Sequence, residues 1–301
     1  MPYKARTEPA EIVILNSLLP RMSLSDKYKQ HYFNLKKGYE GEVQFDIFTE
    51  DLECDCLILN DLLLKQNSSL FQIDSLILTS ETIYLLEVKN FEKDYYYESD
   101  RLYKTSKLEV TNPLTQLNRS ESLMRRLLQQ LGSSIPIAAS VVFINPEFTL
   151  YQAPLNTPFI LPTQIHRYLK NLKQIPSKLN ATHLTLAEKL LSLHIKDSPF
   201  KQLPDYQYDQ LQKGIPCVGC RSLSTFIDGK KCVCKKCGRE EAAGDAIMRN
   251  VNEFRLLFPG ERVTTSRMYE WCKVVESKKR IRRVLDKNFQ SAGDRRWTFY
   301  Y

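Results

Sequence analysis

The sequence lacks the features that define several large classes of protein. It contains no run of about 18 uncharged apolar residues, which a membrane-spanning helix needs. The N-terminal stretch places acidic side chains among its apolar residues and has no signal-peptide core, so we expect a cytoplasmic protein of bacterial or archaeal type. No Gly-rich phosphate-binding loop is present, which argues against an ATPase.

Histidine is also scarce, and cysteine is concentrated in one place. The four histidines have no partners at metal-ligand spacing, so we interpret them as ordinary side chains. Five of the eight cysteines fall between residues 217 and 237. In a chain without a secretion signal, such clustering indicates a metal site rather than disulfide bonds.

Length and charge indicate two parts of different character. A chain of 301 residues with 43% hydrophobic and 26% charged residues has a globular composition and is long enough for two domains. Residues 1–200 carry 22 Lys and Arg against 23 Asp and Glu, whereas residues 201–301 carry 21 against 12. A nearly neutral body joined to a basic region predicts that the C-terminal part binds a polyanion.

The order of predicted elements indicates an α/β (α+β) core. We expect helical segments within 8–30 and over 36–52, strands at 56–64, 71–79 and 82–91, a helix over 112–132 and a strand over 135–145. Residues 94–106 alternate aromatic and polar side chains and are expected to extend the sheet. This order predicts a mixed sheet flanked by helices. The expected parts are a helical segment (1–30), the α/β domain (31–200), a cysteine-rich domain (201–243) and a helical domain (244–301).

Three charged side chains interrupt two of the predicted strands: Asp74, Glu87 and Lys89. An unpaired charge is costly to bury. Glu87 and Lys89 are two residues apart, so both side chains leave the same face of the sheet. A hairpin centred on residues 80–81 would place Asp74 directly opposite Glu87. Because facing carboxylates repel, a cation between them is expected, and their hard oxygen ligands suit Mg²⁺ or Mn²⁺.

These charges have a chemical and a structural interpretation. With a divalent ion between the acids, Lys89 would hold the attacking water or stabilise charge on a phosphate. Alternatively, Glu87 and Lys89 form a structural ion pair on a solvated face of the sheet, and Asp74 is merely exposed. An acid on the preceding helix, Glu42, and a polar residue on the following helix, Gln116, favour the chemical interpretation.

Four segments, GYEGE, FQID, LLEVKN and NPLTQ, occur in this order between residues 35 and 145. They resemble the signature motifs of the nuclease-related domain (NERD), a branch of the PD-(D/E)xK nuclease-like superfamily. The resemblance implies a restriction-endonuclease-like mixed sheet and a catalytic set of Glu42, Asp74, Glu87, Lys89 and Gln116. Within this set, Asp74 and Glu87 would be the metal ligands. The usual Pro-Asp dipeptide is Ile73–Asp74 here, a departure that leaves the metal ligand in place.

The cysteine cluster contains two CxxC pairs separated by thirteen residues: Cys217, Cys220, Cys234 and Cys237. Each pair can turn two thiolates toward one point, so the pairs together predict a structural tetrahedral Zn²⁺ site in a zinc ribbon. Cys232 is an alternative to Cys234, since both cannot join Cys237 in the usual knuckle. We expect Cys234 to be the ligand. A redox-active thiol cluster is the competing interpretation, but no thioredoxin-like pattern surrounds the cysteines.

The last part of the chain predicts three amphipathic helices, the second capped by Thr264 or Thr265 and the third by Ser277. This order resembles a helix-turn-helix, and residues 291–301 could add a wing. Residues 262–296 carry 11 basic and 4 acidic side chains. The basic residues that the third helix would turn outward, toward nucleic acid, are Lys278, Lys279, Arg282, Arg283 and Lys287.

Together these features predict a divalent-metal-dependent nuclease that hydrolyses phosphodiester bonds, with DNA as the expected substrate. The C-terminal modules would bind the nucleic acid, no membrane partner is expected, and a homodimer would allow both strands to be cut. Two alternatives stay open: an inactive nuclease fold that acts as a DNA-binding or regulatory protein, and a zinc-organised scaffold for protein interactions. The enzyme is favoured because every catalytic position that the resemblance implies is filled.

Overall fold

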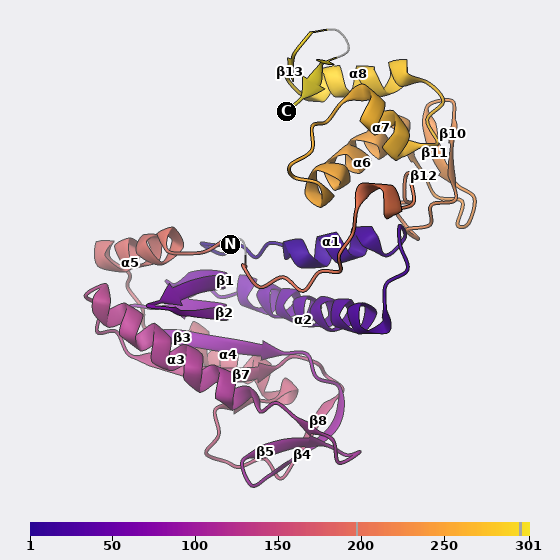
Figure 1. The fold of residues 1–301 in the computed structure, drawn as a ribbon. Coiled ribbons are helices and arrows are strands. Elements are labelled where there is room, and N and C mark those ends of the chain that lie inside the picture. The colour runs from indigo at the N-terminus through magenta and orange to yellow at the C-terminus, as the bar shows by residue number, and fades with distance from the viewer. Residues whose placement is uncertain (197, 295–296) are drawn as a thin grey trace. The chain divides into compact units, whose positions relative to one another are not determined.

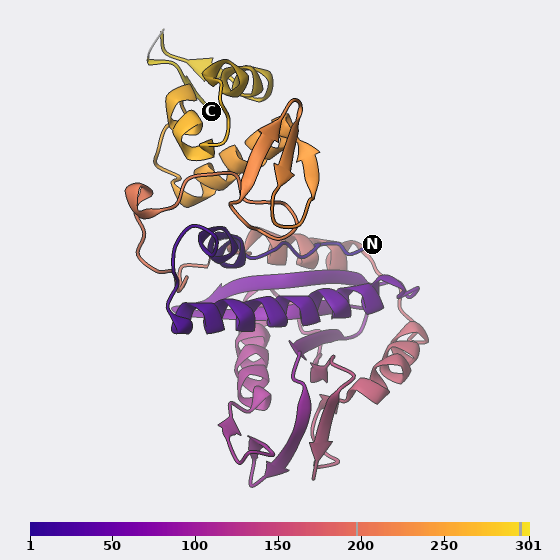
Figure 2. The same cartoon turned by 90° about the vertical axis from the view of Figure 1, so that its right-hand side faces the viewer.

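The computed structural model describes residues 1–301 except 197, 295 and 296, and it divides into two compact units (Figures 1 and 2). The first unit contains Met1–Glu8 and Phe33–Phe200, and the second contains Pro9–Tyr32 and Lys201–Tyr301. The predicted helical segment 1–30 is therefore divided between them. None of the helices in the described part of the chain combines the length and apolarity needed to cross a bilayer.

The first unit is built around a mixed sheet with the strand order β1-β2-β3-β7-β9. Its strands are β1 (Leu57–Gln66), β2 (Ser69–Leu78), β3 (Ile83–Lys89), β7 (Ile137–Phe143) and β9 (Phe159–Ile160). The first three strands are antiparallel neighbours, while β7 pairs in parallel with both β3 and β9. The predicted α/β fold with a mixed sheet is confirmed.

Helices cover both faces of this sheet (Figure 1). They are α2 (Asp26–Glu50), α3 (Pro113–Gln130), α4 (Ile165–Lys173) and α5 (Ala181–Ser192). Because successive strand residues point to opposite faces, Leu85 of β3 joins the core beneath α3 and α5, and Leu86 joins the core beneath α2 and α4. The site described below lies on β2 and β3, between these two helical layers.

Local signals explain where α3 begins and ends. The Asn112 side chain accepts a hydrogen bond from the Leu114 main-chain N–H at 3.0 Å, and Pro113 occupies the first turn. Gly132 follows the helix with φ of +78°, a conformation that glycine adopts without strain. The buried side chains of this helix include Leu117 and Leu127.

One predicted helix boundary is wrong. The structure has a single 25-residue helix, α2, in place of a short helix before residue 30 and a separate helix over 36–52. No proline interrupts this stretch, and an interior glycine such as Gly38 or Gly41 disfavours a helix by only about 1 kcal/mol. Packing of Phe45, which is fully buried, outweighs that penalty.

The expected extension of the main sheet by residues 94–106 is also wrong. These residues belong to a second sheet with the order β6-β5-β4-β8, formed by β4 (Lys93–Glu98), β5 (Arg101–Lys104), β6 (Glu109–Val110) and β8 (Phe148–Tyr151). The edge of β3 that they would need is already paired with β7. Tyr95 and Tyr97 turn into the core, so this segment still packs against the domain.

The second unit combines a three-stranded ribbon with a helical bundle. Its elements are α1 (Ala10–Leu18), β10 (Thr225–Asp228), β11 (Lys231–Cys234), β12 (Glu240–Ala242), α6 (Ala243–Leu257), α7 (Thr265–Cys272), α8 (Lys278–Asn288), β13 (Ser291–Ala292) and β14 (Phe299–Tyr300). One hydrophobic core contains Cys232 of the ribbon, Ile247 of α6 and Ile281 of α8. The predicted cysteine-rich and helical parts therefore share a core.

The end of the second unit has the element order of a winged helix-turn-helix. Thr264 caps α7 by accepting a hydrogen bond from Arg267 N at 3.1 Å. After α8, β13 and β14 pair as a short hairpin, and Tyr300 also bridges to Val263 ahead of α7. The predicted wing is thus present, although Arg295 and Arg296, which contribute to the basic charge of this segment, lie outside the described residues.

Candidate functional site

The register between β2 and β3 brings Asp74 beside Glu87. The paired positions run from Leu78 opposite Ile83 to Ser75 opposite Leu86, as the predicted hairpin requires, and Asp74 and Glu87 come next on their strands. Regular pairing ends there. Asp74 Oδ2 instead accepts a hydrogen bond from the main-chain N–H of Val88 at 2.8 Å, which fixes the carboxylate between the strands.

Both acids are buried. Glu87 is 1% exposed and Asp74 is 6% exposed, so the alternative in which they lie on a solvated face of the sheet does not hold. Glu87 Oε1 accepts a hydrogen bond from Lys89 Nζ at 2.6 Å, whereas the buried Glu87 Oε2 has no hydrogen-bond partner. Such an acceptor is unfavourable in a protein interior, and a bound cation would satisfy it.

Lys89 connects β3 to α3. Its Nζ donates to Glu87 Oε1 and also to Gln116 Oε1, at 3.0 Å. Burial acts to lower the pKa of Lys89, but the carboxylates of Glu87 and Asp74 outweigh it and raise the pKa above its usual value. The ammonium is therefore charged at neutral pH, and its Nζ is held between Glu87 and Gln116.

Glu42 projects from α2 and is bound by Arg6. Arg6 Nη1 donates to Glu42 Oε2 at 2.5 Å, and its Nε and Nη2 donate to the two oxygens of Asp46 at 2.9 and 3.0 Å. Arg6 Nη2 also donates to the main-chain oxygen of Asp74 at 2.7 Å. The guanidinium thus joins α2 to β2, and Glu42 is linked to Asp74 through it.

The acids repel one another. Burial, reinforced by the charge of Asp74, raises the pKa of Glu42 to about 8 and that of Glu87 to about 8. Burial likewise raises the pKa of Asp74, although Lys89 and the Val88 N–H oppose the shift. Each shift opposes ionisation of the acid concerned, and a bound cation would act against it.

Two residues of this group were not identified from the sequence. Asp46 lies one helical turn after Glu42, so their shared helix face was a usable signal. Arg6 is 36 residues away from Glu42 in a segment without periodicity, and nothing in the sequence points to its position.

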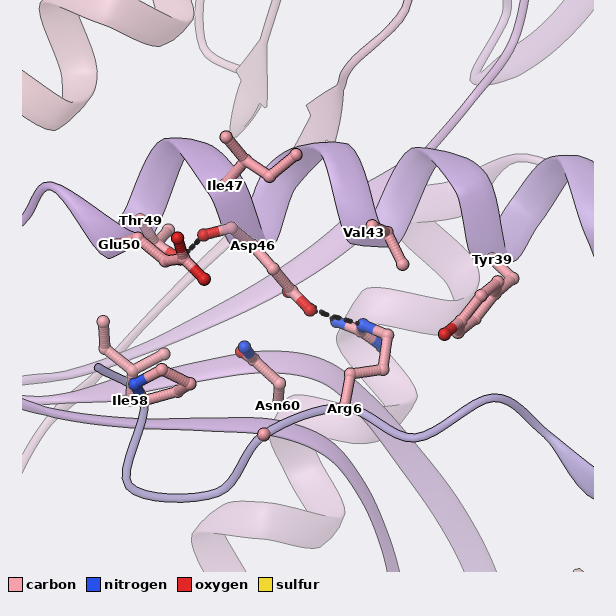
Figure 3. Close-up of a pocket in the computed structure, with 11 residues that line it drawn as sticks. Arg6, Tyr39, Val43, Asp46, Ile47, Thr49, Glu50, Ile58 and Asn60 are labelled. Atoms are coloured by element: carbon pink, nitrogen blue, oxygen red, sulfur yellow. Dashed lines mark hydrogen bonds and ion pairs between the residues drawn. The ribbon is translucent and has the colours of Figure 1, made fainter.

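We call the group of Glu42, Asp74 and Glu87 the acidic site. A cavity of about 240 Å³ lies beside it, between α2, β1 and the N-terminal segment (Figure 3). Arg6 and Asp46 line it and point toward one another there. Asp74, Glu87 and Lys89 are not among its lining residues, so this cavity adjoins the site rather than containing it.

The four predicted zinc ligands form the second candidate site. The sulfur atoms of Cys217, Cys220, Cys234 and Cys237 all lie within 4.8 Å of one another, so they could hold a metal ion such as zinc. Within the described ranges this is the one group of three or more Cys, His, Asp or Glu side chains gathered so closely. Cys232 instead points into the hydrophobic core, with an exposure of 3%.

Each CxxC pair has the backbone of a metal-binding knuckle. Main-chain N–H groups donate to thiols, from Gly219 to Cys217 at 3.3 Å and from Lys236 to Cys234 at 3.4 Å. Donation from the main chain, chiefly by the N–H of Cys237, lowers the pKa of the Cys234 thiol to about 6. A thiolate is the form that ligates a metal, so main-chain donation favours binding at Cys234.

A basic groove of about 700 Å³ lies between α8 and the start of α7. Ile281 and Leu285 face the core, and all five predicted basic residues of α8 are exposed. The groove is lined by Lys278, Lys279, Arg282 and Arg283 together with Thr264, Thr265, Ser266, Asp286, Thr298 and Tyr300. Lys287 is exposed but is not part of this lining.

Comparison with protein families finds a match over the part of the chain that contains the first of these sites. Residues 37–144 match the family model described as the nuclease-related domain, NERD. The matched range contains Glu42, Asp74, Glu87, Lys89 and Gln116, but neither Arg6 nor the second unit. No curated protein and no solved structure matches the chain. The chain therefore carries a nuclease-related domain over residues 37–144.

Proposed function

We propose that the nuclease-related domain hydrolyses phosphodiester bonds with Mg²⁺ or Mn²⁺ held by Asp74 and Glu87. The observation that supports this most directly is a buried pair of acids on adjacent strands in which Glu87 Oε2 has no donor. Carboxylate oxygens are the ligands that these ions prefer. When bound, such an ion polarises a phosphate and lowers the pKa of a coordinated water.

The neighbouring residues have roles that follow from their contacts. The Val88 N–H holds Asp74 Oδ2 in one orientation. Lys89 is charged and partly exposed, so it can donate to a phosphate oxygen and stabilise the charge that develops there. Gln116 holds the Lys89 ammonium toward this position, and Glu42 anchors the side of the site formed by α2.

The second unit would bind the nucleic acid that is to be cleaved. Four cations line the groove of α8, and helix α8 is in the recognition position of a helix-turn-helix, which favours duplex DNA as the ligand. Hydroxyl groups at the start of α7, including those of Thr265 and Ser266, add donors suited to phosphate. The four clustered cysteines would hold a structural Zn²⁺ that organises the ribbon.

The enzymatic role is tested with Glu87→Gln and Lys89→Ala in the zinc-loaded full chain. Plasmid DNA, single-stranded DNA and RNA are incubated with each protein in Mg²⁺ or Mn²⁺. We expect either substitution to reduce cleavage by at least ~100-fold, as loss of a transition-state stabilising group does. Glu109→Gln, which alters an exposed acid of the same domain, is the matched control and should cleave normally. Equal cleavage by all four proteins would refute the proposal.

A binding function without cleavage is the second candidate, because the basic groove is complete without the acidic site. On that alternative, wild-type protein retards DNA in a gel but leaves it intact across a titration of Mg²⁺ and Mn²⁺. Cleavage that appears with the divalent ion and disappears in Glu87→Gln would exclude it.

A further inference from the structure

We infer that Arg6 is a permanent cation of the acidic site, in addition to Lys89. By binding Glu42 it keeps this carboxylate out of metal coordination, and its charge limits the site to one divalent ion. This inference rests on the proposed function, since it concerns the ion that Asp74 and Glu87 would share. It assigns a positioning role to a residue outside the matched nuclease-related domain.

The geometry of Arg6 supports a fixed position. Its side chain is 3% exposed, and its donors contact three groups: the Glu42 carboxylate, the Asp46 carboxylate and the Asp74 main-chain oxygen. Two parallel hydrogen bonds to Asp46 fix the orientation of the Arg6 guanidinium, and the Asp46 carboxylate neutralises its charge. Glu42 Oε2 already accepts a charge-assisted hydrogen bond from Arg6, so an ion that approached this oxygen would compete with the guanidinium for it.

The segment that carries Arg6 is itself attached to the sheet. Lys4 forms a parallel bridge with Leu59 of β1, with main-chain hydrogen bonds of 3.1 and 3.0 Å. The Lys4 ammonium also donates to the main-chain oxygens of Asn60 and Asp61, at 2.6 and 2.8 Å. Arg6 therefore enters the site from a segment that this bridge and these hydrogen bonds hold against β1.

The local charge fits one divalent ion. The acids of the site are Glu42, Asp46, Asp74 and Glu87, and its cations are Arg6 and Lys89, which leaves a net charge of −2 when all are ionised. The next charged pair, Lys4 and Asp61, cancels itself. One Mg²⁺ or Mn²⁺ balances this charge, whereas two would leave an excess of positive charge in a buried site.

The number of Mn²⁺ ions bound per chain tests this inference without a measurement of activity. Mn²⁺ is titrated into the zinc-loaded full chain by calorimetry, in buffer free of other divalent ions. We expect one Mn²⁺ at the acidic site of the wild type and none in Glu87→Gln. Arg6→Met removes one positive charge and frees Glu42, so its count should rise to two, whereas Arg6→Lys keeps the charge and should bind one. Lys36→Met, an exposed position on α2, is the control and should match the wild type.

The outcomes separate the inference from the function on which it rests. Two ions in the wild type would overturn the inference and leave the nuclease proposal standing, and this result needs no variant to fold. A folded Arg6→Met protein that binds a single ion with wild-type affinity would also overturn it. A wild type that binds no Mn²⁺ would refute the proposed metal site itself.

Discussion

Gly41 on α2 lies directly against Asn90, the residue after β3: a Cβ atom added at position 41 would be 2.6 Å from the Asn90 Cβ. Asn90 cannot easily give way, because its Nδ2 donates to the Lys37 main-chain oxygen at 2.7 Å and its Oδ1 accepts from Asn145 at 3.0 Å. The absence of a side chain at Gly41 thus lets α2 approach the end of β3. Glu42, the next residue, is placed by the same close contact.

Gly41→Ala should therefore displace α2 and weaken both stability and cleavage. Overpacking of this kind costs about 1–3 kcal/mol, and we expect cleavage to fall because Glu42 moves with the helix. Gly38→Ala is the matched control on the same helix, since nothing lies within 4 Å of a Cβ at that position. It should leave cleavage unchanged and increase stability by up to about 1 kcal/mol. Urea unfolding and plasmid cleavage measure both effects, and similar behaviour of the two variants would contradict this explanation.

The position of Asp74 beside Glu87 was predictable from the sequence for a simple reason. A short connection between two strongly apolar strands restricts the register, and alternation of side chains then places the charged residues. The same reasoning could not show that β7 takes the free edge of β3, because parallel pairing depends on contacts distant in sequence. Hence residues 94–106 were assigned to the wrong sheet.

The metal-free protein should lose stability as the pH rises, because burial raises the pKa of Glu87 from 4.5 to about 8. Between these values the folded state binds more protons than the unfolded state, so the free energy of unfolding falls with increasing pH. Thermal melting at pH 6, 7 and 8, in buffer that retains zinc but lacks Mg²⁺ and Mn²⁺, should show this slope. Glu87→Gln should reduce the slope, and added Mn²⁺ should flatten it in the wild type only. An identical slope in both proteins would contradict the assignment.

The clustering of the four cysteines was also predictable, since the CxxC spacing alone distinguishes Cys234 from Cys232 when each pair must form a knuckle. The spacing could not show where the Cys232 side chain lies. It belongs to the core that α6 and α8 complete, which depends on packing between parts far apart in the chain. The position of Arg6 was unpredictable for the same reason, as its partner Glu42 is 36 residues away and no motif links the two.

Substitution of Cys234 and substitution of Cys232 should have different effects. Cys234→Ser removes a ligand, so we expect loss of bound zinc and unfolding of the ribbon. Cys232→Ala leaves the four thiols intact and should retain zinc, with a loss of roughly 1 kcal/mol from the core. Zinc content by mass spectrometry and thermal unfolding measure both changes. Loss of zinc in Cys232→Ala with retention in Cys234→Ser would reverse our assignment.

The basic groove beside α8 predicts how the affinity for DNA depends on salt concentration. If Arg282 and Arg283 contact phosphates, each contact contributes about 0.9 to the dependence of log K on log salt concentration. The double substitution to alanine should therefore weaken binding and reduce this slope by about 2. Lys287→Ala should change the slope less, because Lys287 lies outside the groove, and Lys230→Ala on the ribbon should not change it. Fluorescence anisotropy with duplex DNA at several salt concentrations gives these slopes. A slope that falls equally for Lys230→Ala would mean that the charge of the whole unit, and not the groove, holds the DNA.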